Sequence, residues 1–346
     1  MKILIDLSIL RHRWCGLGQI AMSYGLWYAK HPETIDPGCD VTLLVPKDFI
    51  GVFGNNVHYL EARDIYRIMP WLMPQFDLWH SIHQMSPFRP SHHGTRQILT
   101  IHDVNFIYEK HGAKRQKYIR RLQRECDRAD VLCFISRFAQ KDTSKHINLV
   151  DKPQHVIYNG VAPLAEGPQR PVAEATDGKP FMLSIGVLKA KKNLHTLLPM
   201  MDLLPDYHLI IAGDDSDIYA EQLREQLPQH PNVSVVGTVS DEQRRWLYAH
   251  CTALLFPSLS EGFGLPVIEA MQWGKPVFCS DRTSLPEIGS THAFYFTDFE
   301  PESMAAVVRK GLAAFDASAA KAEKKYAAAY SYESHMRQYW SIYTNK

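Results

Sequence analysis

Short apolar runs alternate along the chain with segments of helical spacing, and this alternation constrains the fold more than any other feature. It is typical of βαβ units, which build parallel sheets covered by helices. The expected strands lie at 2–6, 41–45, 77–80, 97–101, 131–135 and 155–158 in the first half, and at 181–185, 208–212, 233–236, 253–256 and 276–279 in the second. The sequence therefore predicts an α/β fold with two Rossmann-like, doubly wound parallel-sheet domains.

A stretch at 162–180 separates the two sets of strands, and its prolines, glycines and polar residues are typical of a linker. The length of 346 residues suits two domains, at roughly 150 residues per domain. We therefore predict a first domain over 1–165 and a second over 166–328. The remaining stretch, 329–346, includes apolar residues at helical spacing and is predicted to form a further helix.

The composition excludes several classes of protein. Lysine and arginine total 38 against 37 acidic residues, so the net charge is +1, without the basic excess of a dedicated nucleic-acid binder. The first apolar run is too short for a signal peptide, and no run approaches the roughly 18 apolar residues of a membrane span. Six cysteines form no Cys-x-x-Cys pair, which predicts reduced thiols, no structural zinc and a cytoplasmic protein.

The segment 257–271 carries the most specific pattern in the chain. It follows an expected strand, passes through a glycine-rich loop and enters an expected helix with Pro266 in its first turn. The amides of Gly264 and Leu265 then lie at a helix N-terminus, where free N–H donors and a partial positive charge suit a diphosphate or a sugar hydroxyl. Ligands of doubly wound sheets bind at the carboxyl ends of strands, so a site is expected here.

Two acidic residues flank that helix start. Glu261 lies in the loop and Glu269 lies about one turn into the helix, so both carboxylates are expected to face one cleft. The alternative is a surface charge at Glu261 and a helix-dipole contribution from Glu269.

This segment resembles the Glu-x7-Glu signature of the retaining, nucleotide-sugar-dependent glycosyltransferases with the GT-B fold, also called the group 1 or glycogen synthase-like family. The resemblance continues at 101–103, 156–161, 185–193, 213, 236–239 and 285–287. It implies two domains facing a central cleft, with the acceptor on 1–165 and the donor on 166–328. It also implies that 329–346 crosses back to the first domain.

The resemblance further implies an activity: transfer of a sugar from a GDP- or UDP-sugar to an acceptor hydroxyl, with retention of configuration, in polysaccharide or glycolipid biosynthesis. Glu269 would accept hydrogen bonds from the ribose hydroxyls, Glu261 would lie near the transferred sugar, and Lys192 would neutralise the diphosphate. The residues expected around the donor are Gly186, Lys192, Gly237, Gly262, Phe263, Gly264, Leu265 and Glu269. Many relatives carry an arginine where this chain has Val187, so Lys189 or Lys191 is a candidate substitute.

His102 directly follows the expected strand 97–101 and so belongs to the carboxyl edge of the first sheet. The resemblance places it against the donor sugar, whereas Asp103 is expected to orient the loop. The alternative is an ordinary loop histidine, one of 17 in the chain.

The run Gly16-Leu17-Gly18-Gln19-Ile20-Ala21 formally matches a dinucleotide fingerprint, which would indicate an NAD-dependent oxidoreductase. The context does not fit, because residues 7–15 separate the strand from the first glycine. We interpret the run as the family's glycine loop, in which Gly18 allows the backbone to approach the donor phosphate or the acceptor, or else as a structural turn. A non-catalytic sugar- or lipid-binding module is a further alternative, disfavoured by the two acids and Lys192.

Basic residues gather on one side of an expected helix at 113–129, namely Lys114, Lys117, Arg121, Arg124 and Arg128. A solvated face over a buried stripe is one interpretation. The other is an anionic partner, either a membrane surface that is contacted peripherally or a lipid-linked diphosphate acceptor, at roughly 1 kcal/mol per basic residue near anionic lipid. Residues 71–73 are expected to add an apolar foot or to pack in the core.

Asp215 and Asp217 resemble the Asp-x-Asp motif that holds a metal in another glycosyltransferase fold. They follow the second strand of the donor half, whereas Lys192 and the helix start at 264–266 already supply positive charge to a diphosphate. The sequence therefore predicts catalysis without a divalent metal.

Overall fold

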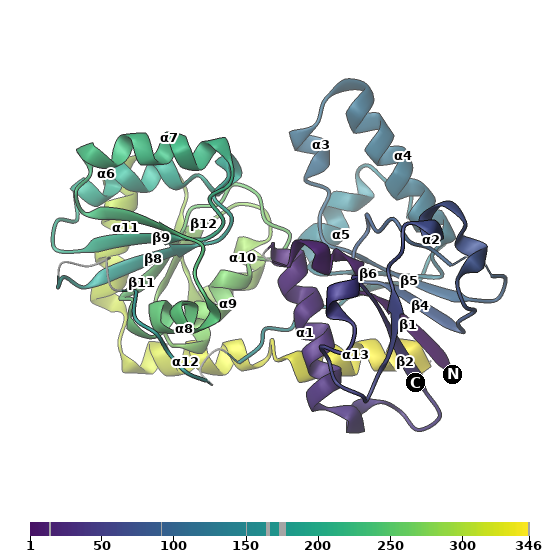
Figure 1. The fold of residues 1–346 in the computed structure, drawn as a ribbon. Helices are drawn as coiled ribbons and strands as arrows, with labels where there is room; N and C mark the ends of the chain where they lie inside the picture. The colour runs from purple at the N-terminus through teal and green to yellow at the C-terminus, as the bar shows by residue number, and fades with distance from the viewer. Residues whose placement is uncertain (14, 91, 150, 164–166, 173–177, 345–346) are drawn as a thin grey trace. The chain divides into compact units, whose positions relative to one another are not determined.

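The computed structural model describes residues 1–13, 15–90, 92–149, 151–163, 167–172 and 178–344. It has two compact units (Figure 1): one is Met1–Asn159 together with the chain from His335 onward, and the other is Gly160–Ser334. The sequence predicts these boundaries after 165 and after 328. Residues 164–166 and 173–177 of the expected linker, and 345–346 at the C-terminus, lie outside the described residues.

The described part of the first unit contains a seven-stranded sheet in which all neighbours run parallel, in the order β3-β2-β1-β4-β5-β6-β7. The strands are β1 (Lys2–Asp6), β2 (Asp40–Val45), β3 (His58–Glu61), β4 (Leu78–Ser81), β5 (Arg96–Ile101), β6 (Val131–Phe134) and β7 (Gln154–Val156). Central strands of such a sheet are covered on both faces, which explains why Ile3, Leu4 and Ile5 form an unbroken, fully buried apolar run.

The helices of the first unit include one from the end of the chain. They are α1 (Gly16–Lys30), α2 (Ile65–Ile68), α3 (Phe106–Glu109), α4 (Gly112–Arg128), α5 (Arg137–Ser144) and α13 (Tyr332–Thr344), with short 3-10 turns that include η1 (Ser8–His12) and η4 (Pro70–Leu72). Helix α13 is fastened by buried hydrogen bonds: Tyr343 bonds to His80 at 2.6 Å and Tyr339 to Thr100 at 2.7 Å.

The second unit has a parallel sheet that comprises six strands in the part of the chain that the structure describes, in the order β10-β9-β8-β11-β12-β13. Its strands are β8 (Phe181–Ile185), β9 (His208–Ala212), β10 (Val233–Gly237), β11 (Ala253–Phe256), β12 (Val277–Ser280) and β13 (Phe294–Phe296). The order places β8 and β11 at the centre, where the switch point of a doubly wound sheet lies.

Helices cover both faces of this second sheet, with α6 and α7 above it and α8, α9 and α12 below it in Figure 1. They are α6 (Leu197–Asp202), α7 (Ile218–Gln226), α8 (Asp241–His250), α9 (Leu265–Gln272), α10 (Leu285–Gly289), α11 (Pro301–Ala314) and α12 (Ala317–Ala328). The predicted α/β class with two doubly wound parallel sheets is therefore confirmed.

Two strands escaped the prediction. The side chains of β3 stay partly exposed and its sequence, His-Tyr-Leu-Glu, is half polar. Strand β13 is three residues long. Both lie at sheet edges, where one side of the strand is unpaired and a continuous apolar run is not required.

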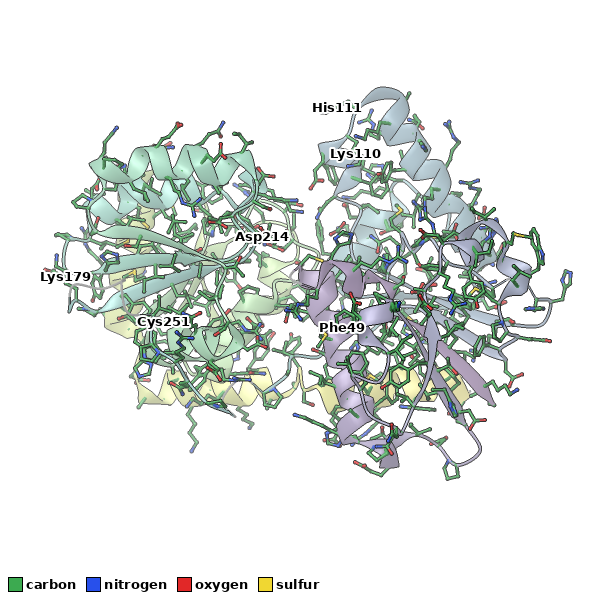
Figure 2. All side chains as sticks on the ribbon, viewed as in Figure 1. Phe49, Lys110, His111, Lys179, Asp214 and Cys251 are labelled. Carbon is green, nitrogen blue, oxygen red and sulfur yellow. The ribbon has the colours of Figure 1, made fainter. Side chains whose placement is uncertain are left out.

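The cysteines are all free, as predicted, and four of them are buried: Cys126, Cys133, Cys251 and Cys279. Cys251, labelled in Figure 2, follows α8 directly and is 1% exposed. Burial raises the pKa of this thiol to about 12, so it stays protonated and behaves as a small apolar side chain. Among the helices built from described residues, none is long and apolar enough to cross a bilayer.

Candidate functional site

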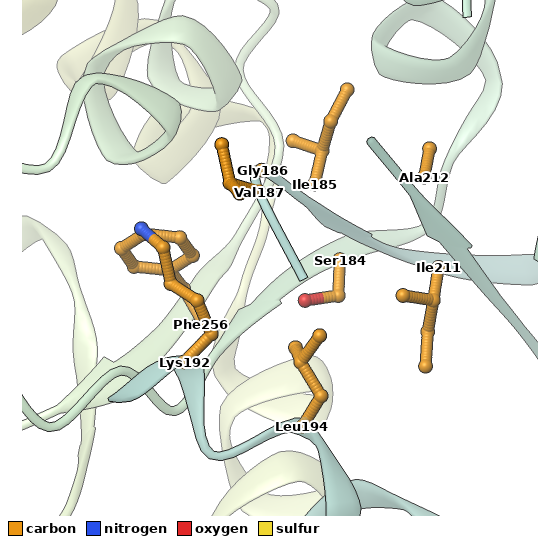
Figure 3. A pocket seen from close by; sticks show the side chains of 9 residues that line it. All are labelled: Ser184, Ile185, Gly186, Val187, Lys192, Leu194, Ile211, Ala212 and Phe256. Carbon is orange, nitrogen blue, oxygen red and sulfur yellow. The ribbon is translucent and has the colours of Figure 1, made fainter. Parts of the chain in front are cut away.

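A pocket opens at the carboxyl ends of the central strands of the second sheet (Figure 3). Strands β8, β9 and β11 end here, as expected for the ligand site of a doubly wound sheet. Its lining residues are Ser184, Ile185, Gly186, Val187, Lys192, Leu194, Ile211, Ala212 and Phe256. Gly186 and Lys192, both predicted site residues, are therefore brought together.

Lys192 and Glu261, predicted separately as catalytic residues, form one ion pair. Their side chains are only 15% and 14% exposed, so solvent screens the pair weakly. The Lys192 ammonium also lies 4.9 Å from the ring centroid of Phe256, a cation–π arrangement visible in Figure 3. The cation expected to meet a diphosphate thus already has an anionic partner.

The loop that carries Glu261 is held by the segment after β12. The Thr283 hydroxyl accepts a hydrogen bond from the Glu261 amide at 3.0 Å. The Ser284 hydroxyl lies 3.0 Å from the carbonyl oxygen of Glu261 and 2.9 Å from that of Phe263, and it donates to them. Gly262 and Phe263, both predicted to bind the donor nucleotide sugar, are buried and form part of the packed interior of this loop.

Gly264 connects this loop to α9. Its φ of 103° lies in the left-handed region, and a Cβ there would come within 2.7 Å of Leu285 Cδ2, so the position requires glycine. Helix α9 then begins at Leu265 with Pro266 in its first turn, as predicted. The N-terminal amides of a helix have no partner within it and carry partial positive charge.

Glu269 is 8% exposed and both of its carboxylate oxygens are engaged by α8. Arg244 donates from Nη1 to Oε1 at 3.2 Å, and the Tyr248 hydroxyl donates to Oε2 at 2.7 Å. These two residues were missed by sequence reasoning. Their spacing of four places them on one face of α8, which was the only available signal.

The carboxylates of Asp215 and Asp217, in the loop after β9, already have partners in the protein. Asp215 is ion-paired with Arg224, which lowers the pKa of the carboxyl despite the opposing effect of burial. Asp217 caps α7 by accepting from the Tyr219 amide at 3.1 Å. The described residues include no group of three or more histidine, cysteine or acidic side chains arranged to hold a metal ion. Gly237 ends β10 close to Asp215.

His102 lies in the first unit, in the loop after β5. It is 6% exposed, its Nε2 donates to the Ile82 carbonyl at 2.7 Å, and its amide donates to Gln84 at 3.1 Å. Burial lowers the pKa of His102 to about 4, although the bond to Ile82 opposes this shift, so the ring is neutral near pH 7. Asp103 binds the Asn105 amide at 3.1 Å and so orders the loop, as expected.

Gly18 lies in the first turn of α1 and packs against η1. A Cβ at this position would overlap the carbonyl oxygen of His12 and the backbone of Arg13. The structure therefore gives Gly18 a packing reason, in line with the structural alternative weighed above, and leaves the proposed approach of a ligand as a prediction.

The basic face predicted on α4 is only partly a solvated surface. Arg121 is half-buried and donates to the carbonyl oxygens of Met85 and Ser86 at 3.0 and 3.1 Å, so it is not simply solvated. Lys114, Lys117 and Arg124 are exposed as predicted. Residues 71–73 divide between the two expectations: Trp71 and Leu72 are 59% and 51% exposed, whereas Met73 is buried in the core.

Two family models match the chain. The one described as glycosyl transferases group 1 matches residues 167–327, and the one described as glycosyltransferase family 4 matches residues 29–163. The chain belongs to the group 1 glycosyltransferases. The run at 16–21 lies outside both matched ranges, so its interpretation as the family's glycine loop stays a prediction.

Relatives of this group 1 glycosyltransferase include two bacterial enzymes. O-antigen chain mannosyltransferase B of Escherichia coli is 31% identical in an alignment of length 218 that covers 57% of this chain and 56% of that protein. O-antigen chain mannosyltransferase RfbU of Salmonella typhimurium is 27% identical over 62% of this chain and 60% of its own length. The chain thus matches less than two thirds of the length of either relative.

Solved structures share the fold over the whole chain. Sucrose-phosphate synthase from Thermosynechococcus elongatus has a TM-score of 0.76 at 16% identity and covers 100% of this chain and 98% of its own. HepE from Anabaena, solved in complex with UDP-glucose, also has a TM-score of 0.76 at 16% identity, with both chains fully covered. The predicted GT-B fold is therefore confirmed for this family member.

Val187, where many family members carry arginine, lines the pocket beside Lys192. Lys189, one candidate substitute, is exposed in the turn before η5 (Ala190–Lys192). Lys191 is partly buried, and its carbonyl oxygen accepts from the Leu259 amide at 2.8 Å. Among these basic residues, Lys192 is the one that lines the pocket.

Proposed function

We propose that this group 1 glycosyltransferase transfers a hexose from a GDP- or UDP-sugar to an acceptor hydroxyl and retains the anomeric configuration. The observation that carries the proposal is the pocket at the carboxyl edge of the second sheet, where Lys192 meets Glu261. Mannose is the first candidate sugar and a cytoplasmic step of polysaccharide biosynthesis the proposed setting, because two relatives are named O-antigen mannosyltransferases.

In the proposed reaction the bond between the anomeric carbon and the diphosphate oxygen breaks, the acceptor oxygen bonds to the same carbon, and the acceptor's proton passes to the departing diphosphate oxygen. Attack on the face that the diphosphate leaves, through an ion-pair-like state, retains the configuration without a protein nucleophile. The charge that grows on the diphosphate is stabilised by Lys192 and by the amides at the start of α9. Because these groups supply the positive charge, no divalent metal is proposed.

The remaining predicted site residues keep the roles that the family resemblance gave them. We assign the second unit to the donor, with Glu269 at the ribose and the loop after Gly237 beside the nucleotide. We assign the first unit to the acceptor, with His102 and Gly18 near the reacting groups.

A panel of ligands tests the donor class. Unfolding temperature is measured with GDP, UDP, ADP, TDP and NAD in turn, because a ligand at a hundredfold excess over its Kd stabilises the native state by about 2.7 kcal/mol. Stabilisation by GDP or UDP is expected, and stabilisation by NAD alone would overturn the proposal. NMR of the product made from GDP-mannose then reports whether the configuration at the anomeric carbon is retained.

Peripheral contact with an anionic membrane is proposed as well, through the exposed basic residues of α4. The observation that favours it is the exposure of Lys114, Lys117 and Arg124 together with that of Trp71 and Leu72 in the same unit. Basic side chains attract anionic lipid, and tryptophan suits the headgroup region.

A further inference from the structure

Helix α8 presents two hydrogen-bond donors to a single carboxylate. Arg244 and Tyr248 are one turn apart, on the same face of the helix, and each binds a different oxygen of Glu269. The start of α8 is fixed by a capping box, in which Ser240 and Gln243 exchange hydrogen bonds between side chain and backbone. The position of Arg244, in the first turn after this cap, is therefore well defined.

The cluster of Glu269, Arg244 and Tyr248 is buried, so the Glu269 carboxylate depends on both of its hydrogen-bond partners for stability. The side chains of Glu269 and Arg244 are 10% and 23% exposed, and Tyr248 is fully buried. A carboxylate out of water is stable only when it is paired and hydrogen-bonded. Burial alone would lower the pKa of Arg244, but Glu269, Tyr248 and Asp241 raise it overall, so the guanidinium stays charged.

The Glu269 carboxylate can accept more hydrogen bonds than Arg244 and Tyr248 donate. An ionised carboxylate has about four acceptor positions, two on each oxygen. Arg244 occupies one on Oε1 and Tyr248 occupies one on Oε2. By this count each oxygen can accept one further hydrogen bond, which is the number that the two adjacent hydroxyls of a ribose would donate.

We propose that Arg244, assisted by Tyr248, is the positioning residue that orients Glu269 to recognise the ribose diol of the donor nucleotide. The inference rests on the proposed function, in which Glu269 meets the ribose. Arg244 does not touch the nucleotide. It fixes the carboxylate plane, so that both hydroxyls are bound at once rather than one at a time.

The test compares nucleotides with and without the 2′-hydroxyl. Affinities for GDP, UDP and their 2′-deoxy forms are measured by calorimetry for the wild type, Arg244→Met and Arg244→Lys. The wild type is expected to prefer the ribonucleotide about tenfold, the usual size of a hydrogen bond to a charged group. In Arg244→Met this preference should fall to about twofold or less, and Arg244→Lys should restore part of it.

A matched control is Arg245→Met, which removes a charge from the same helix at a residue that binds the Pro168 carbonyl instead of Glu269. It should keep the wild-type preference. If Arg244→Met does not fold, Tyr248→Phe removes only the hydrogen bond to Oε2 and should also lower the preference. In Glu269→Gln the preference is lost, and adding Arg244→Met should lower it no further.

The outcomes separate the two claims. A wild type that binds no nucleoside diphosphate overturns the proposed function, and the inference with it. A wild type that prefers the ribonucleotide, together with an Arg244→Met variant that keeps the same preference, overturns the inference alone.

Discussion

At the scale of single residues, the pairing of Lys192 with Glu261 is the feature with the clearest consequence. A bound diphosphate would have to share Lys192 with that carboxylate. We therefore expect Glu261→Gln to tighten the binding of GDP or UDP by at least about threefold, because a negative charge near the phosphates is removed, while sugar transfer decreases. Calorimetry and a transfer assay measure the two effects.

The control for this prediction is Lys192→Met, which should weaken nucleotide binding because it removes the cation itself. Weaker nucleotide binding by Glu261→Gln would mean that the carboxylate supports the diphosphate site rather than competing for Lys192.

Some residues of the site could be predicted from the sequence, and others could not. Glu261 and Glu269 could be predicted because the loop, the glycines and the helix start lie in one continuous segment. Arg244 and Thr283 could not, because their contacts join elements that are far apart in sequence and depend on packing. The contacts of Arg121 could not be predicted for a related reason: a helical projection shows which residues share a face, but not which backbone carbonyls lie within their reach.

At the scale of elements, α4 supplies a test of membrane contact. Reversal of two exposed charges, Lys114→Glu with Lys117→Glu, is expected to reduce sedimentation with phosphatidylglycerol vesicles at least tenfold, at roughly 1 kcal/mol for each basic residue lost. Nucleotide binding should not change.

The matched control for α4 is the pair Lys321→Glu and Lys325→Glu, two exposed positions on α12. Equal loss of sedimentation in both pairs would show only a dependence on net charge. Arg121→Glu does not serve this test, because it breaks two hydrogen bonds to backbone carbonyls and is expected to destabilise the first unit.

Helix α12 carries a buried acid with no partner. Glu323 is 2% exposed, neither carboxylate oxygen has a hydrogen bond in the described structure, and burial raises its pKa to about 9. The folded state therefore keeps a proton that the unfolded chain loses above about pH 4.5, and stability is lost as pH rises through this window. Glu323→Gln should raise the free energy of unfolding at pH 8 by on the order of 2 kcal/mol.

Urea unfolding at pH 8 and at pH 4 measures this effect. At pH 4 the glutamate is mostly protonated in both states, so the variant and the wild type should be similar. An equal difference at both pH values would mean that the amide changes packing and that the charge is irrelevant.

Elements differ in how well the sequence predicts them. The buried strands β1, β8, β9 and β11 were placed closely, because each is an apolar run bounded by polar residues. The edge strand β13 is also apolar, Phe-Tyr-Phe, but its three residues are fewer than the four to eight of a typical strand pattern, and a partner on one side suffices to hold it.

At the scale of the whole molecule, the first unit is marked by buried histidines with strongly lowered pKa values. The first unit holds four whose pKa burial lowers: His80 to about 3, and His83, His102 and His335 to about 4. His335 belongs to α13, and its ring nitrogen Nδ1 bonds to the Tyr158 carbonyl, so the C-terminal helix supplies one of the four histidines.

These histidines make the first unit sensitive to acid. Their folded pKa lies below the unfolded value near 6.5, so the unfolded chain binds more protons, and stability falls as pH decreases from 6.5 toward 4. Each fully buried histidine contributes up to roughly 3 kcal/mol over that range.

We expect hydrogen exchange at pH 5 to open amides of β4 and β5 before those of β8 and β11. His80→Gln, which removes one such group while keeping a polar side chain, should reduce the loss of stability between pH 7 and pH 5. If the second unit opened first, or if His80→Gln left the pH dependence unchanged, carboxyl protonation would govern acid unfolding instead.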